Sequence, residues 1–307
     1  MKIAVMGSGG VGGYYGGLLA RQGHDVTFIA RGSHLKAIQE NGLQVKSVHG
    51  DFHLVPAKAT DSPTEIGPVD LVLFCTKTHA TDEAAQQIKP IVGTKTTVMS
   101  LQNGIEAAEQ IGAVIGMGHI IGATTWISSS VEALGVIKQV SQFRRVVLGE
   151  MDGQATPRVQ LIYETLRETG ITAELSENIL KILWTKFVFI AAISSLGSLT
   201  RLPIGEYRAV SETRNMMISL MEEIVSVALA QKVNLDQDIV QKSLDFIDNA
   251  APQIKASMQL DVEAGRRSEL ESMVGVIGRK GRELGIPTPT ADMTYAALLP
   301  LDLKARG

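Results

Sequence analysis

Short apolar runs alternate with segments of helical character through the first half of the chain. The run Met1–Met6 is followed by a helical segment, Tyr14–Arg21, and then by a second apolar run, Asp25–Ala30. Short apolar runs bounded by turn residues are typical of strands that are buried on both faces of a parallel sheet. The same alternation predicts strands at Val69–Cys75, Thr96–Ser100, Ile120–Ile127, Val146–Gly149 and Ile171–Leu175, and helices at Thr81–Ile88, Ile105–Gln110 and Pro157–Thr169. The first half therefore predicts an α/β, doubly wound parallel sheet.

The pattern changes after Glu177, where long helical segments replace the short strands. These helices are predicted at Ile179–Leu199, Ala209–Lys232, Gln237–Phe246, Ser257–Ala264, Glu269–Leu284 and Ala291–Leu299. We therefore expect an N-terminal α/β domain over residues 1–176 and a C-terminal all-helical domain over residues 177–307. No repeat, low-complexity tract or flexible linker separates them.

A glycine-rich turn follows the first strand at once and leads into the first helix. Its residues are Gly7, Ser8, Gly9, Gly10, Val11 and Gly12. In a strand, turn and helix of this kind, the first glycine makes the tight turn. The second lets the backbone approach a pyrophosphate, and the third lets the helix pack on the strand. Such a motif alone is weak in a chain with 30 glycines, where a structural turn is the alternative. Its position here predicts a Rossmann-type dinucleotide site.

Arg31 stands at the end of the second strand, where a site for NAD has Asp or Glu. A carboxylate there binds the ribose hydroxyls and repels a 2′-phosphate, whereas a guanidinium can bind that phosphate bidentately. The residue type predicts NADPH as the cofactor. The alternative is an ordinary solvated surface charge.

Two further strand ends carry polar residues that can contact a cofactor from the carboxyl edge of the sheet. Lys77 follows the third strand, and Asn103 with Gly104 follows the fourth. A solvated loop lysine and a turn of positive φ are the respective alternatives.

Lys186 is the strongest catalytic candidate, because it lies in an overwhelmingly apolar helical segment, residues 182–193. Desolvation there would lower the pKa of its ammonium toward the range useful for proton transfer. The alternative is a long side chain that reaches solvent past its neighbours. Ile190 and Ser194 follow at one and two helical turns and share its face.

Ser257 and Glu269 are the other polar candidates in the helical half. On one straight helix, their separation of twelve positions would set them about 120° apart. Gly265 lies between and can interrupt the helix, which would let both residues face one site. The neighbouring charges can equally be paired along exposed faces.

Composition narrows the class of protein. The chain of 307 residues is 45% hydrophobic and 20% charged, with a net charge of −3. These values indicate a globular protein and give no reason to expect nucleic acid or an anionic membrane as a partner. Cys75, the single cysteine, is expected to be a buried strand residue. No secretory signal is recognisable, the longest purely apolar stretch, Phe187–Ile193, is too short to span a bilayer, and we expect a cytoplasmic protein.

These residues, in this order and spacing, resemble the ketopantoate reductases (2-dehydropantoate 2-reductases). The resemblance runs from end to end and is carried by Gly7–Gly12, Arg31, Lys77, the sequence Leu-Gln-Asn-Gly at 101–104, Trp-Thr-Lys at 184–186, Ser-Met-Gln-Leu-Asp at 257–261, Glu269 and Gly-Ile-Pro-Thr-Pro at 285–289. It implies NADPH-dependent reduction of ketopantoate to pantoate, a step of pantothenate and coenzyme A synthesis. It also implies a Rossmann domain followed by a helical domain like that of 6-phosphogluconate dehydrogenase.

The resemblance also implies roles for single residues. Lys186 becomes the general acid, and Glu269 an active-site carboxylate that binds substrate or orients the lysine. Arg31 and Lys77 become NADPH contacts, Asn103 a contact of both cofactor and substrate, and Ser257 a substrate ligand. No metal is implied, and a homodimer is possible.

The chain departs from the family pattern next to the lysine. Ketopantoate reductases commonly carry asparagines four and eight residues after the lysine, where this chain has Ile190 and Ser194. Losing the first amide removes a donor and an acceptor from the substrate pocket. A reductase of another, more apolar 2-oxo acid is therefore an alternative to a ketopantoate reductase. A catalytically idle NADP-binding sensor on the same fold is a third interpretation.

Overall fold

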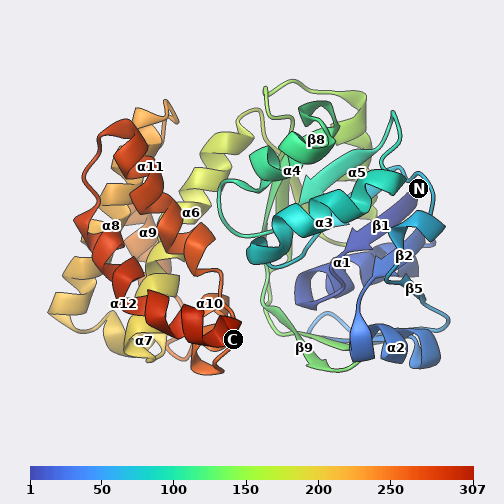
Figure 1. Ribbon diagram of the computed structural model, residues 1–307, viewed down its shortest axis with the longest axis horizontal. Coiled ribbons are helices and arrows are strands. Elements are labelled where there is room, and N and C mark those ends of the chain that lie inside the picture. The colour runs from blue at the N-terminus through green and yellow to red at the C-terminus, as the bar shows by residue number, and fades with distance from the viewer. The chain divides into compact units, whose positions relative to one another are not determined.

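The computed structural model describes residues 1–307, and the chain divides into two units. The first unit contains Met1–Gln102 and Glu106–Ile179, and the second contains Asn103–Ile105 and Leu180–Gly307. The division after Ile179 lies three residues beyond the predicted boundary at Ser176. The short segment Asn103–Ile105, which sequence analysis placed with the α/β domain, belongs to the helical unit. Figure 1 shows a sheet with helices in the first unit and helices alone in the second.

The first unit is built on an eight-stranded sheet with the strand order β12-β11-β8-β7-β6-β1-β2-β5. Strand β1 pairs in parallel with both β2 and β6, so the chain order reverses at β1. The predicted doubly wound sheet is confirmed. One edge departs from the prediction, because β11 runs antiparallel to β8. The strands are β1 (Lys2–Met6), β2 (Asp25–Ile29), β5 (Lys58–Thr60), β6 (Leu71–Phe74), β7 (Thr97–Ser100), β8 (Ile120–Trp126), β11 (Arg145–Gly149) and β12 (Thr172–Leu175).

Five α-helices belong to this unit. They are α1 (Gly10–Arg21), α2 (Gly32–Asn41), α3 (Thr81–Ile88), α4 (Ala107–Ile115) and α5 (Pro157–Glu168). Helices α3 and α4 lie side by side (Figure 1). Cys75 follows β6 directly, and burial raises the pKa of its thiol, as suits an inert residue at the end of a strand.

A second sheet of four short strands was not predicted. Its order is β4-β3-β10-β9, with β3 (Leu43–Ser47), β4 (Phe52–Leu54), β9 (Ser129–Ala133) and β10 (Val136–Gln139). Strand β3 pairs in parallel with β10, which lies about ninety residues further along the chain. The strands are three to five residues long and of mixed polarity, so no local pattern distinguished them from loops.

Helix α1 packs between the two sheets, and glycines on two of its faces allow both approaches. A Cβ added at Gly16 would lie 2.6 Å from Val5 of the large sheet, and one at Gly13 would lie 2.7 Å from Ile137 of the small sheet. Both distances are shorter than a van der Waals contact. The two sheets thus hold α1, and with it the preceding glycine turn, from opposite sides.

The second unit is all-helical, as predicted. Its helices are α6 (Ile179–Thr200), α7 (Ile204–Tyr207), α8 (Ser211–Ala230), α9 (Ile239–Asp248), α10 (Ser257–Glu263), α11 (Val276–Leu284) and α12 (Pro289–Arg306). Helix α6 is long and apolar enough to cross a membrane by length and composition, beyond the short stretch noted in the sequence. Two thirds of its most apolar window is buried, at 67%, as in the core helix of a soluble protein. Its buried side chains, including Val188 and Ala191, belong to the core of this unit.

Candidate active site

The turn between β1 and α1 combines crowded glycines with an open one, Gly9. Gly7 has a φ of +94°, and a Cβ there would lie 2.8 Å from the backbone nitrogen of Thr76. Only glycine fits this position. A Cβ at Gly12 would lie 2.1 Å from the carbonyl oxygen of Gly7, so Gly12 is equally required where the helix meets the turn. Around the Cβ position of Gly9, by contrast, there is no atom within 4 Å.

The N-terminus of α1 is suited to an anion. No side chain caps the helix at Gly9, and its first turn contains no acidic residue. The first backbone N–H groups of a helix lack intrahelical partners and carry partial positive charge. The room over Gly9 and these N–H groups together fit the pyrophosphate of a dinucleotide. Ser8 is buried and donates its hydroxyl to the carbonyl of Ile29 at 3.1 Å, which ties the turn to β2.

His34 is a residue of this region that sequence analysis missed. The backbone N–H of Gly135 donates to its Nδ1 at 3.2 Å, so Nε2 carries the ring hydrogen and donates to the carbonyl of Ser8 at 2.9 Å. His34 therefore joins α2, the glycine turn and the turn between β9 and β10. Its partners lie 26 and 101 residues away along the chain, so no local motif could have revealed the contact.

Arg31 precedes α2 and is paired, although it is exposed. Its Nη2 donates to Oε1 of Glu83 at 2.8 Å and to Oε1 of Gln87 at 2.9 Å, both on α3. Lys77, the other basic candidate at the sheet edge, is exposed in the segment between β6 and α3. Arg31 follows β2 and Lys77 follows β6, the two strands that flank β1 in the sheet.

Lys186 on α6 does not reach solvent, since only 6% of it is exposed. Its ammonium donates to Oδ1 of Asn103 at 2.9 Å. Burial lowers the pKa of Lys186 to about 8, and the negative charge of Glu269 opposes part of that shift. Three residues far apart in the sequence therefore meet in the helical unit: an amide, an ammonium and a carboxylate.

Hydrogen bonds from neighbouring residues fix the backbone of Glu269. It is 5% exposed, and its carbonyl accepts hydrogen bonds from the N–H of Met273 and the hydroxyl of Ser272. The predicted helix Glu269–Leu284 begins here with a π-helical turn, Glu271–Gly275, before it continues as α11. Such π-turns occur often at functional sites.

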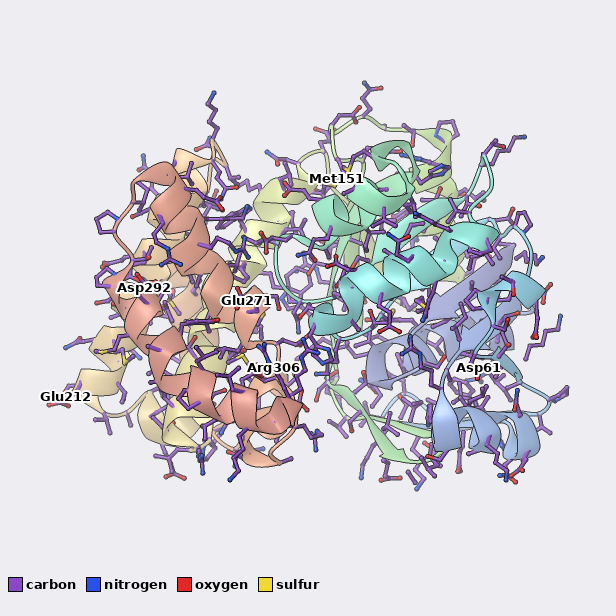
Figure 2. All side chains as sticks on the ribbon, in the orientation of Figure 1. Asp61, Met151, Glu212, Glu271, Asp292 and Arg306 are labelled. Carbon is purple, nitrogen blue, oxygen red and sulfur yellow. The ribbon has the colours of Figure 1, made fainter.

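Asp302 on α12 fixes the residue before Glu269, and sequence analysis missed it too. Its Oδ1 accepts from the N–H and the hydroxyl of Ser268, both at 2.9 Å, and its Oδ2 accepts from Arg306 at 2.6 Å. Burial alone would raise the pKa of Asp302, but these hydrogen bonds outweigh it and lower the pKa below its ordinary value. Figure 2 labels Arg306 on α12.

Comparison with known proteins identifies the family. The model of the ketopantoate reductase PanE/ApbA family matches residues 3–153, and that of its C-terminal domain matches residues 178–302. The chain belongs to the ketopantoate reductase family.

Individual relatives agree with this assignment along their whole length. An uncharacterized oxidoreductase, YkpB of Bacillus subtilis, is 30% identical over 97% of this chain and 98% of its own. A 2-dehydropantoate 2-reductase of Mesorhizobium japonicum is 30% identical over 99% of this chain and 98% of its own. The crystal structure of a PanE/ApbA family ketopantoate reductase from Ralstonia eutropha matches with a TM-score of 0.92 and 31% identity, and all of each chain is covered.

Three other residues that the family resemblance singled out lie elsewhere on α6 and at the start of α10. Ile190 is half-buried and packs against the core of the helical unit, and Ser194 is buried on the same helix. Ser257 begins α10 with its side chain exposed and hydrogen-bonds to neither Lys186 nor Asn103. The predicted break before Glu269 is confirmed, because Gly265 has a φ of +64° directly after α10.

Proposed function

We propose that this chain is an NADPH-dependent 2-dehydropantoate 2-reductase, which reduces ketopantoate to pantoate in pantothenate and coenzyme A synthesis. The observation that carries the proposal is the buried ammonium of Lys186, bound to Asn103 and near Glu269. A lysine with its pKa lowered to about 8 can both donate and regain a proton near neutral pH. Membership of the family supports the same activity.

NADPH supplies the hydride that adds to the carbonyl carbon of the 2-oxo acid. The hydride brings two electrons, and negative charge develops on the carbonyl oxygen. The Lys186 ammonium stabilises that oxygen and then gives it a proton, which leaves a neutral amine and a 2-hydroxy acid. Asn103 accepts a hydrogen bond from the ammonium and so orients it, while Glu269 favours its charged form. The glycine turn and Arg31 are assigned to the dinucleotide.

A second candidate substrate is another 2-oxo acid with a more apolar side chain. Ile190 favours it, because isoleucine cannot hydrogen-bond the hydroxyl of ketopantoate. The third interpretation is a non-catalytic NADP-binding sensor. The burial of Lys186 argues against a sensor, because a buried ammonium is costly and a sensor has no use for its proton.

The test is NADPH oxidation with a panel of 2-oxo acids that differ in their side chains. We expect steady turnover with ketopantoate, and we expect Lys186→Met, which keeps the side-chain volume without the proton, to abolish most of it. A higher kcat/KM for 2-oxo acids without a hydroxyl would replace ketopantoate by the second candidate. NADPH binding without turnover of any 2-oxo acid would favour the sensor.

A further inference from the structure

The guanidinium of Arg31 forms an ion pair with the carboxylate of Glu83. Glu83 and Gln87 both approach Nη2 of Arg31 from α3, and Nε2 of Gln87 donates to Glu83 Oε1 at 3.0 Å. The three side chains form one small network, and more than half of the Arg31 and Glu83 side chains is exposed, at 56% and 60%. Nε and Nη1 of Arg31 make no hydrogen bond, so their N–H groups remain available, although each bidentate edge of the guanidinium includes the occupied Nη2.

Two side chains with opposite effects on coenzyme choice therefore lie together at the end of β2. A carboxylate at this point accepts hydrogen bonds from the ribose hydroxyls of NAD, and a guanidinium binds the 2′-phosphate of NADP. In this chain the end of β2 carries Arg31, and α3 returns a carboxylate, Glu83, to within 2.8 Å of it. A 2′-phosphate bound to the remaining N–H groups of Arg31 would share the guanidinium with the negative charge of Glu83.

We propose that Glu83 is a specificity-determining residue that limits the preference for NADPH and lets the site accept NADH. The inference rests on the proposed function only in taking Arg31 as the ligand of the adenosine ribose or its phosphate. The Glu83 carboxylate offsets the charge of Arg31 and repels a dianionic 2′-phosphate. Toward NADH, the same carboxylate accepts a hydrogen bond from the ribose hydroxyl.

Glu83→Gln tests this, because it keeps the shape and the hydrogen-bond acceptor and removes the charge. We expect the ratio of kcat/KM for NADPH to kcat/KM for NADH to rise about three- to tenfold, as for one screened charge several ångströms from the phosphate. The rise should shrink as salt is added. Thermal stability should not change, since the pair is exposed.

Asp82→Asn is the matched control. Asp82 precedes Glu83 in the first turn of α3, is likewise exposed, and makes no hydrogen bond or ion pair with Arg31, so its variant should leave the ratio within about twofold. A ratio that stays the same or falls in Glu83→Gln would overturn the proposal, and a fall would make Glu83 a residue that positions Arg31 for phosphate. An equal response to Asp82→Asn would overturn it as well, because the effect would then be general charge.

Equilibrium titration with NADPH and NADH, followed by nucleotide fluorescence, separates this inference from the proposed function. Dissociation constants need no turnover, so they test Glu83 even if no 2-oxo acid is reduced. A shift of the two dissociation constants in the expected direction without activity would support the inference and reject the enzyme.

Discussion

Helix α1 of the first unit and helix α6 of the second contribute candidate functional groups of different kinds. Helix α1 offers backbone groups, and glycines let it approach both sheets and leave room over Gly9. Helix α6 offers one side chain, Lys186, within a long apolar helix. A site made of backbone has strict local requirements for residue type, whereas a site made of side chains depends on partners from elsewhere in the chain.

The two helices also differ in the free-energy cost of carrying these groups. On α1, the N–H groups carry their partial charge in any sequence, and the cost lies in replacing side chains by glycine. On α6, burying the ammonium of Lys186 opposes its charge, as its lowered pKa shows. Asn103 and Glu269 offset part of that cost. Substitutions on the two helices should therefore fail in different ways.

The largest effect is expected from Lys186→Ala. It removes the proton donor and should lower kcat by roughly 10²–10⁴, the usual range for a positioned acid, with the dissociation constant of NADPH unchanged. Glu269→Ala should also lower kcat strongly. If the two residues act as a unit, the double variant will be little worse than either single one. Near-normal turnover of Lys186→Ala would show that α6 does not supply the proton donor.

The pH profile of the reduction should report the same group. A general acid must be protonated, so kcat/KM should be level below the pKa of about 8 and fall about tenfold per pH unit above it. For the reverse oxidation, which needs the neutral amine, the rate should rise through the same pH. Profiles of both directions with saturating coenzyme would check this. A reduction rate that is level well above this pKa would exclude Lys186 as the acid.

Arg31→Ala tests a side chain of the first unit that is proposed to bind the coenzyme. A charge-assisted contact with phosphate contributes about 1.5–3 kcal/mol. Because Glu83 already holds Nη2, we expect the lower end, an increase of about tenfold in the KM for NADPH. The KM for NADH should hardly change. A wild-type enzyme that strongly prefers NADH would contradict this assignment.

Gly9→Ala and Gly12→Ala separate ligand room from packing on α1. A methyl group at Gly9 meets no atom within 4 Å, so stability should be normal. It would occupy the space assigned to the pyrophosphate and weaken NADPH binding about tenfold, comparable to one lost hydrogen bond to a charged group. At Gly12 the methyl group would lie 2.1 Å from the Gly7 oxygen and should lower the Tm. Equal loss of Tm in both variants would contradict the distinction.

The comparison also explains how far the sequence could be interpreted. The glycine turn and the sheet around it were predictable, because tight turns and buried strands impose local patterns. The small sheet was not, since β3 pairs with β10 across a long stretch of chain. Lys186 was suggested by its apolar surroundings, but its meeting with Asn103 is tertiary. His34 and Asp302 act through backbone carbonyl and N–H groups of distant segments, and such contacts leave no signature in residue spacing.

The smallest expected effect concerns the substrate and Ile190, one helical turn beyond Lys186. Ile190 is half-buried and packs on the helical core, and it cannot pair with the hydroxyl of ketopantoate. Ile190→Asn restores the amide common in the family. If Ile190 lines the hydroxyl subsite, the variant should raise kcat/KM for ketopantoate, relative to a 2-oxo acid without a hydroxyl, by about 1 kcal/mol or about fivefold.

The ratio of the two specificity constants, measured in wild type and variant, cancels general damage from the substitution in the core. Ser194→Ala, two turns beyond Lys186 on the same helix, is the comparison variant for a hydroxyl as the alternative partner. An unchanged ratio in Ile190→Asn together with a reduced one in Ser194→Ala would move the hydroxyl subsite to Ser194. Substrate specificity would then depend on Ser194 and proton transfer on Lys186, two buried polar side chains within a mostly apolar helix.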